Sequence, residues 1–177
     1  FIGDKAMKLA LGDEYTNTLR KVYSHLPESI DFVMYWWDKA GEAIRLSMAN
    51  RFGFITTNSI KQTFNRKVLS RLLDARDPSS IVFAIPDHPW VDNADGASVR
   101  VAMTVCVPVW QIGVLLEVVR ERYTSGENAA DVEFITSNGR INTDLTIGAD
   151  VAGTKGLRSG EGLHSNGMML AGAGFIL

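Results

Sequence analysis

Cations, an amide and an aromatic side chain follow two apolar runs of the sequence. Asn58 comes directly after the run at residues 52–57, and Trp90 comes shortly after the run at residues 81–85. The segment between the two runs carries four cations, namely Lys61, Arg66, Lys67 and Arg71. A ring can stack on an unpaired base while lysine and arginine hold phosphates, so this pattern indicates a nucleic-acid site. The alternatives are a solvated helix face for the cations and a core position for the tryptophan.

Other catalytic chemistries have less support in the sequence. There is no Gly-x-Ser-x-Gly motif, and His25, His88 and His164 fall in unrelated turns, which disfavours both a nucleophilic triad and a histidine metal site. Cys106 is the only cysteine, which excludes an internal disulfide and a multi-cysteine zinc site, and its apolar neighbours predict a core position. The glycine pairs at 160–162 and 172–174 do not clearly follow a strand and open a helix, so a phosphate loop is not favoured.

The elements that must position these residues follow from the apolar periodicity. Helices are predicted over residues 14–26, between Ser29 and Met48, and over the segment whose apolar face is Phe64, Val68, Leu69, Leu72 and Leu73. Short strands are predicted at 52–57, at 81–85 before Pro86, and at 99–107. The first two strands and the helix between them form a βαβ unit, so they run parallel and end at one edge of a sheet. The third strand follows without a helix and is predicted to be antiparallel.

The sequence pattern changes after residue 112. Residues 114–119, 132–136 and 141–145 are predicted to be three short strands, and Asn138-Gly139 is a hairpin signal between the last two. Eight glycines among residues 148–174 are typical of a connector. We therefore expect a β appendage followed by a glycine-rich link.

Composition excludes several classes of protein. The chain has 177 residues, 46% of them hydrophobic, and its 18 basic against 20 acidic residues leave a net charge of −2, so any basic surface must be local. No apolar run approaches the roughly 18 residues of a membrane span and no secretion signal is evident, so we expect a cytoplasmic protein without a membrane partner. The chain starts at Phe1 and stops on an apolar stretch, which favours a piece of a longer protein.

Several segments, in this order, resemble the amino-group DNA methyltransferases, especially the large fused restriction-modification enzymes that methylate adenine. Residues 1–3 (FIG) resemble the end of the catalytic motif Asn-Pro-Pro-Phe/Tyr, with Phe1 as its last residue. Further similar segments are the following helix at 31–37 (DFVMYWW), the next strand and its polar end at 53–59 (GFITTNS), a loop and antiparallel strand at 86–90 (PDHPW) and 95–103 (DGASVRVAM), and the approach to target recognition at 144–151 (DLTIGADV) and 170–175 (LAGAGF).

The resemblance implies an α/β fold, namely the C-terminal half of a Rossmann-like S-adenosylmethionine-dependent methyltransferase sheet with an antiparallel strand and a β appendage. Residues 1–112 would be the C-terminal part of the catalytic domain, 113–147 a β-hairpin appendage, and 148–177 a connector to a target-recognition domain. A fused nuclease is a further domain that such enzymes can carry. Double-stranded DNA is the implied partner.

The resemblance also implies the chemistry. Such an enzyme flips the adenine out of the duplex and stacks it on an aromatic ring, here that of Phe1. Asn58 and Trp90 would contribute to the base pocket, and Lys61, Arg66 and Lys67 would contact phosphates. S-adenosylmethionine would be bound mainly by residues upstream of Phe1, so we expect the 177-residue chain alone to be inactive. The alternatives are an RNA or protein methyltransferase of the same fold and a non-catalytic α/β scaffold.

Overall fold

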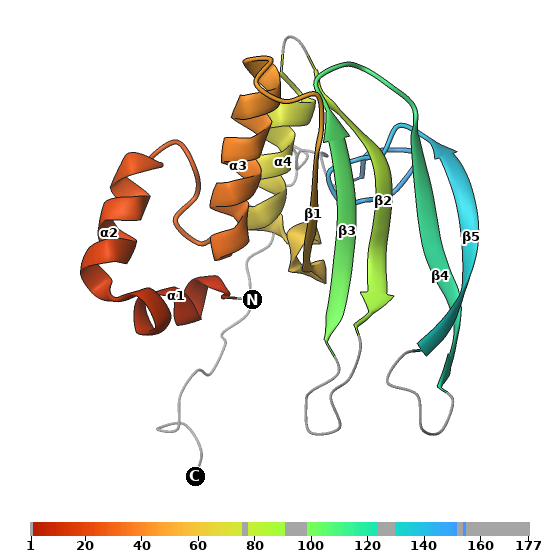
Figure 1. The fold of residues 1–177 in the computed structure, drawn as a ribbon, viewed down its shortest axis with the longest axis horizontal. Coiled ribbons are helices and arrows are strands. Elements are labelled where there is room, and N and C mark those ends of the chain that lie inside the picture. Colours follow the sequence, from red (N-terminus) through yellow and green to blue (C-terminus); the bar gives the residue numbers. More distant parts are fainter. Residues whose placement is uncertain (1, 76–77, 91–98, 124–129, 152–153, 155–177) are drawn as a thin grey trace, which may run out of the picture.

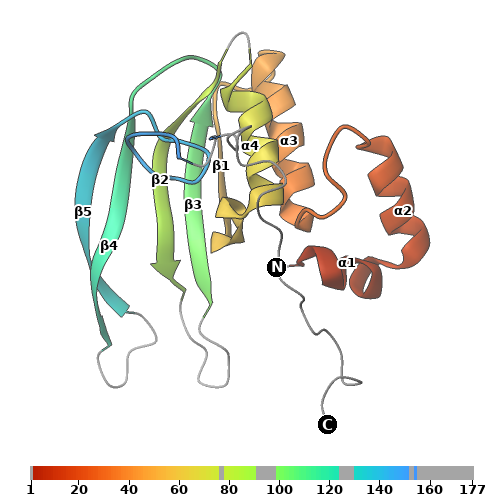
Figure 2. The same cartoon turned by 180° about the vertical axis from the view of Figure 1, so that it is seen from behind.

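The computed structural model describes residues 2–75, 78–90, 99–123, 130–151 and 154, and these residues form an α/β fold. A mixed five-stranded sheet carries its helices on one face, and Figures 1 and 2 show this layer arrangement from opposite sides. Helices α3 and α4 lie beside the sheet, and α1 and α2 lie farther out, beyond α3. Phe1 and nearly all of the predicted glycine-rich connector lie outside the described residues.

Two short helices open the chain. These are α1 (Asp4–Leu11) and α2 (Asp13–Val22), joined at Gly12, whose φ of 85° favours a residue without a Cβ. The sequence does not predict α1, because Met7 is its one buried apolar side chain and gives no apolar periodicity. The helix predicted at residues 14–26 corresponds to α2 and ends earlier, at Val22.

The two helices that pack on the sheet are α3 (Phe32–Arg45) and α4 (Thr63–Leu73). Trp37 of α3 is fully buried and meets the ring of Phe52 edge-on, at 5.0 Å between the ring centroids. The predicted apolar stripe of α3 ends before Met48, which is exposed beyond the helix. In α4 the buried face begins at Asn65, whereas Phe64 is half-exposed.

The five strands are β1 (Phe52–Thr57), β2 (Ser80–Pro89), β3 (Arg100–Val107), β4 (Gly113–Tyr123) and β5 (Ala130–Gly139). Their order in the sheet is β1-β3-β2-β4-β5. β3 is antiparallel to both β1 and β2, so β1 and β2 run in the same direction, as predicted, with β3 inserted between them. β4 runs parallel to β2, and β5 is antiparallel to β4.

β2 continues past Pro86, where the sequence predicted its end. The pairing with β3 is irregular between Ile85 and His88, and Pro86 lies within this irregularity. A proline has no N–H for the ladder and is tolerated at such a bulge, so it does not stop the strand. β2 therefore carries Asp87 and His88 as strand residues.

The hairpin after residue 112 differs from the one predicted. β4 and β5 are the paired strands, and Asn138 lies opposite Val114 within their ladder. The prediction of a hairpin turn at Asn138-Gly139 was therefore wrong. Residues 141–145 form a tight turn instead of a strand, closed by an Asn142 N–H that donates to the Thr146 carbonyl at 2.8 Å. Because β4 pairs with β2, the β4–β5 hairpin continues the sheet.

The core lies between the sheet and the two packed helices. Cys106 of β3 is fully buried, as predicted, and burial raises the pKa of its thiol to about 12. The turn at residues 141–145 contributes Ile141 and Leu145 to the same cluster. Among the described residues, no helix has the length and apolar character needed to cross a membrane.

Candidate functional site

Four segments meet at the edge of the sheet where β1 and β2 end. β1 leads directly into the short 3-10 helix η1 (Asn58–Lys61), and the segment before α1 reaches the same place, as the N-terminal marker in Figure 1 shows. A cavity of about 710 Å³ lies between these segments. Its lining combines the start of the chain (Ile2, Gly3, Asp4, Lys5, Ala6), the entry to α3 (Ser29, Asp31, Val33), the end of β1 (Thr57, Ser59) and the start of α4 (Gln62, Phe64, Asn65).

Asp31 is the polar centre of this cavity wall. One carboxylate oxygen, Oδ2, accepts from Ser59 Oγ at 2.5 Å and from Asn65 Nδ2 at 2.8 Å. The other oxygen, Oδ1, accepts from the Asp4 N–H at 3.3 Å. The Asp31 carboxylate thereby connects the beginning of α1 with η1 and α4.

A second polar network lies beside the first, on the strands. Asn58 Nδ2 donates to Asp87 Oδ1 at 3.1 Å, and Arg100 Nε donates to the same oxygen at 2.6 Å. Arg100 also donates to Glu121 Oε1 of β4 at 2.8 Å. Asn58 is therefore held by a strand network that extends to β4.

The electrostatics of this network favour its charged form. Partial burial acts to raise the pKa of Asp87, but hydrogen bonds from Arg100 and Asn58 and the charges of Arg100 and Lys61 outweigh burial and lower it. The two carboxylate partners of Arg100 raise the pKa of its guanidinium. The carboxylate of Asp87 thus remains an acceptor for the Asn58 amide at neutral pH.

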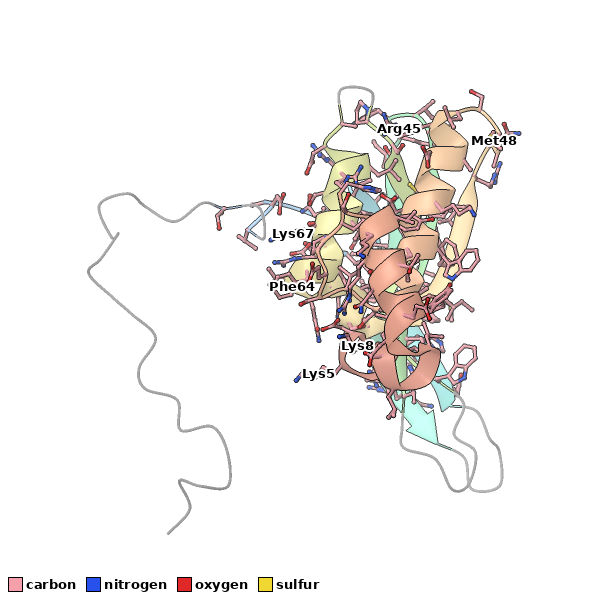
Figure 3. The ribbon with its side chains drawn as sticks, turned by 90° about the vertical axis from the view of Figure 1, so that its left-hand side faces the viewer. Lys5, Lys8, Arg45, Met48, Phe64 and Lys67 are labelled. Atoms are coloured by element: carbon pink, nitrogen blue, oxygen red, sulfur yellow. The ribbon has the colours of Figure 1, made fainter. Side chains whose placement is uncertain are left out.

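Three predicted phosphate-binding cations lie on η1 and α4. Within the described part of the chain, Lys61, Arg66 and Lys67 form no ion pair, and Lys67 Nζ lies 5.3 Å from the centre of the Phe64 ring. Arg71 differs, because it pairs with Asp38 at 3.5 Å. Figure 3 shows Phe64 and Lys67 together on α4, and Phe64 lines the cavity together with Lys5. Lys61 and Arg66 do not line the cavity, but they adjoin its lining residues Gln62 and Asn65 in the sequence.

Of the two predicted aromatic residues of the base pocket, the structure describes Trp90 and not Phe1. The Trp90 side chain, which follows β2, is 42% exposed, and the backbone N–H of Trp90 donates to the Val99 carbonyl at 2.8 Å, which extends the pairing of β2 with β3. Trp90 is therefore not a core residue, and it shares the carboxyl edge of β2 with Asp87, the partner of Asn58. Phe1, the predicted stacking residue, lies outside the described residues, although its neighbour Ile2 lines the cavity.

The sequence analysis missed the polar residues that organise this edge. Asp31, Asn65 and Asp87 gave no recognisable spacing, because the partners of Asp31 are 27 to 34 positions away and those of Asp87 are 13 and 29 positions away. Such pairs become visible only once the chain is folded. The one available signal was that Asp31 and Asp87 fall inside segments that carry the family resemblance.

The described residues contain no cradle for the methyl donor. No described strand leads through a glycine-rich turn into a helix, and the closely packed glycines Gly113 and Gly139 are crowded by isoleucine side chains instead of facing a cavity. These residues therefore do not by themselves form a site for S-adenosylmethionine.

The mixed sheet, the antiparallel β3 and the cavity at the ends of β1 and β2 define an α/β domain with a candidate ligand site at the carboxyl ends of its strands. The sequence matches the family model described as MmeI, DNA-methyltransferase domain, over residues 1–112. The chain belongs to this family, which confirms the resemblance to restriction-modification DNA methyltransferases.

A solved structure has the same fold. It is described as the type IIL restriction-modification enzyme MmeI in complex with DNA, and the match has a TM-score of 0.61 at 24% sequence identity. The match covers 85% of this chain and 19% of that chain, so the present chain corresponds to about a fifth of MmeI. A comparison with curated protein sequences finds no match.

Proposed function

We propose that this chain is the substrate side of a site-specific DNA methyltransferase that transfers a methyl group from S-adenosylmethionine to the exocyclic amine of a flipped adenine. The observation that carries the proposal is the convergence of the segment after Phe1, the end of β1 and the start of α4 around one cavity, in a chain of the MmeI methyltransferase family. A cavity beside cations suits a base removed from its duplex while phosphates are held outside.

Each predicted residue has a role in this proposal. Phe1 stacks on the extruded base, and Asn58 and Trp90 border the base pocket. The side-chain NH₂ of Asn58 donates to Asp87. Its side-chain oxygen, Oδ1, has no partner among the described residues and is available to accept a hydrogen bond from an amine. Lys61, Arg66 and Lys67 contact phosphates on either side of the flipped nucleotide.

The remaining parts of the enzyme are proposed from the family. Upstream residues hold the methyl donor, which supplies an electrophilic methyl group when bound. Residues 1–112 belong to the catalytic domain, 113–147 to a β appendage that extends its sheet, and 148–177 to a connector toward target recognition. Double-stranded DNA is the partner, the compartment is the cytoplasm, and a nuclease in the same polypeptide would complete a restriction-modification enzyme.

The test uses the complete enzyme and a plasmid substrate. Transfer of labelled methyl groups to DNA, followed by nucleoside analysis, should give N6-methyladenine. Phe1→Ala should abolish transfer while DNA binding and thermal unfolding remain unchanged, and Trp90→Ala should slow transfer. Trp36→Ala, which removes a half-exposed tryptophan on α3, is the matched control and should have the wild-type rate.

Three outcomes would contradict the proposal. Methylation of RNA or of a protein glutamine, without methylation of DNA, would favour a related methyltransferase. No methyl transfer to any of these substrates would favour a scaffold. An unchanged rate in Phe1→Ala would remove Phe1 from the site.

A further inference from the structure

The Asp31 network is more extensive than the packing of α3 requires. Asp31 is the residue before α3, a position where an aspartate commonly caps the helix, yet its side chain makes no capping hydrogen bond. Its carboxylate is directed instead to Asp4, Ser59 and Asn65, which come from three other segments. The ordinary structural role of an aspartate at this position is therefore not the role that Asp31 has.

Asn65 makes the network rigid. This asparagine is only 4% exposed, and both ends of its amide are used. Its Oδ1 accepts from the Asp31 N–H at 3.0 Å, while its Nδ2 donates to Asp31 Oδ2 and to the Ser59 carbonyl, at 2.8 and 2.9 Å. A buried network in which these polar atoms have partners fixes the relative positions of its members.

The network also holds the backbone that directly follows Phe1. The Ile2 carbonyl accepts from the Phe32 N–H at 3.0 Å, and the Asp4 N–H donates to Asp31 Oδ1 at 3.3 Å. Two consecutive residues at the start of α3, Asp31 and Phe32, thereby hold the chain on both sides of Gly3. The first described residue after Phe1 is thus fixed relative to the end of β1.

We propose that Asp31 is a positioning residue, which aligns the segment carrying Phe1 with the end of β1 so that the Phe1 ring faces the flipped base. This inference rests on the proposed function. Asp31 itself touches no reacting atom, and its effect on methyl transfer passes through the placement of Phe1. Displacements of about 1 Å in such a segment can change rates on the order of a hundredfold.

The carboxylate is required because all three side-chain partners of Asp31 are donors. An asparagine at position 31 offers one acceptor oxygen, and its NH₂ group would face either the Asp4 N–H or the donors Ser59 and Asn65. Asp31→Asn therefore changes the side-chain volume very little, but it places an NH₂ donor against another hydrogen-bond donor at one end of the network. It leaves α3 unaffected, since no capping bond is lost.

The experiment measures hydrogen exchange and single-turnover methylation in the complete enzyme at saturating DNA. In Asp31→Asn, the amide of Asp4 should exchange at least tenfold faster, whereas the amides of α3 after its first turn should be unchanged. The single-turnover rate constant should fall at least tenfold, with DNA affinity within about twofold of wild type. Asp13→Asn is the matched control, because Asp13 is exposed and pairs only with Lys8, and this variant should have wild-type rates.

The same substitution in an enzyme that already lacks the Phe1 ring distinguishes a positioning role of Asp31 from a general loss of structure. In a Phe1→Leu enzyme, which lacks the stacking ring, adding Asp31→Asn should change the rate by less than twofold. An equal loss in both backgrounds, an unchanged rate in Asp31→Asn, or unchanged exchange at Asp4 would each overturn the inference. Methylation that is present in wild type and lost in Phe1→Ala would uphold the proposed function whichever way Asp31→Asn behaves.

Discussion

Gly113 is the glycine at which, among those the structure describes, an added methyl group would make the closest contact. It opens β4, close to β2 and to the turn that follows β5. A Cβ at this position would overlap the Ile81 carbonyl oxygen and would lie 2.8 Å from Ile141 Cδ1. The isoleucine side chain can rotate away, but the carbonyl belongs to the backbone of β2, which is paired on both sides. Gly113→Ala must therefore displace a strand.

The expected cost follows from two opposing contributions. Overpacking of this kind costs about 1–3 kcal/mol, and a contact with backbone belongs in the upper part of that range. Alanine loses less backbone entropy than glycine on folding, which returns about 0.5–1 kcal/mol. The net loss should be about 2 kcal/mol, and for a protein of this size that lowers the melting temperature by about 4–8 °C.

Urea and thermal unfolding, followed by circular dichroism, measure this loss. Gly41→Ala is the control, because its added Cβ would lie 3.1 Å from Leu72 Cδ2, the end of a flexible side chain, and helix α3 favours alanine over glycine. The stability of this control should stay within about 1 kcal/mol of wild type. A Gly113→Ala protein as stable as Gly41→Ala would refute the close approach of β4 and β2.

Three further predictions concern titration, reactivity and an orphaned donor. Because the folded pKa of Asp87 lies below its ordinary value of 3.8, its network stabilises the fold above that pH and is lost as the pH falls through the lower folded pKa. Asp87→Asn should therefore weaken the fall in the urea midpoint below about pH 4. Burial, which raises the pKa of Cys106 to about 12, should prevent alkylation by iodoacetamide at pH 8 in the native protein, with labelling only after unfolding in urea. Trp37 is fully buried and its Nε1 has no hydrogen-bond partner among the residues that the structure describes, so Trp37→Phe should change stability by less than about 1 kcal/mol in denaturant titrations, because removal of an unsatisfied donor offsets lost packing. Trp37→Ala should cost about 3–5 kcal/mol in the same assay.

The strands of the fold could be predicted where apolar runs are short and bounded by polar residues. β1 coincides with its prediction at 52–57, and the antiparallel direction of β3 followed from the lack of a helix before it. The prediction failed at Asn138-Gly139, because a local hairpin signal cannot account for pairing between strands whose register is set over their whole length. Helical periodicity similarly assigned Phe64 to the core, whereas Asn65 occupies the buried position.

The candidate site could be predicted from the sequence only in part. Cations and an amide after β1, and an aromatic after β2, predict a nucleic-acid site, and Asn58 and Trp90 follow the ends of two strands that run in the same direction. The residues that hold this edge are polar groups such as Asp31 and Asn65, whose burial is tolerated only because each finds a partner far along the chain. A local sequence pattern does not show which distant residues will form hydrogen bonds with each other.

The place of β3 between β1 and β2 has a consequence for synthesis of the protein. β1 and β2 have no ladder with each other, and the strand that joins them is made after both. While a ribosome has not yet released residues 100–107, β1 and β2 are not joined by any ladder through β3, and a sheet that depends on such late, distant pairing forms slowly. Translation pauses before this point would therefore lengthen the time during which the nascent chain exposes two unpaired apolar strands to chaperones.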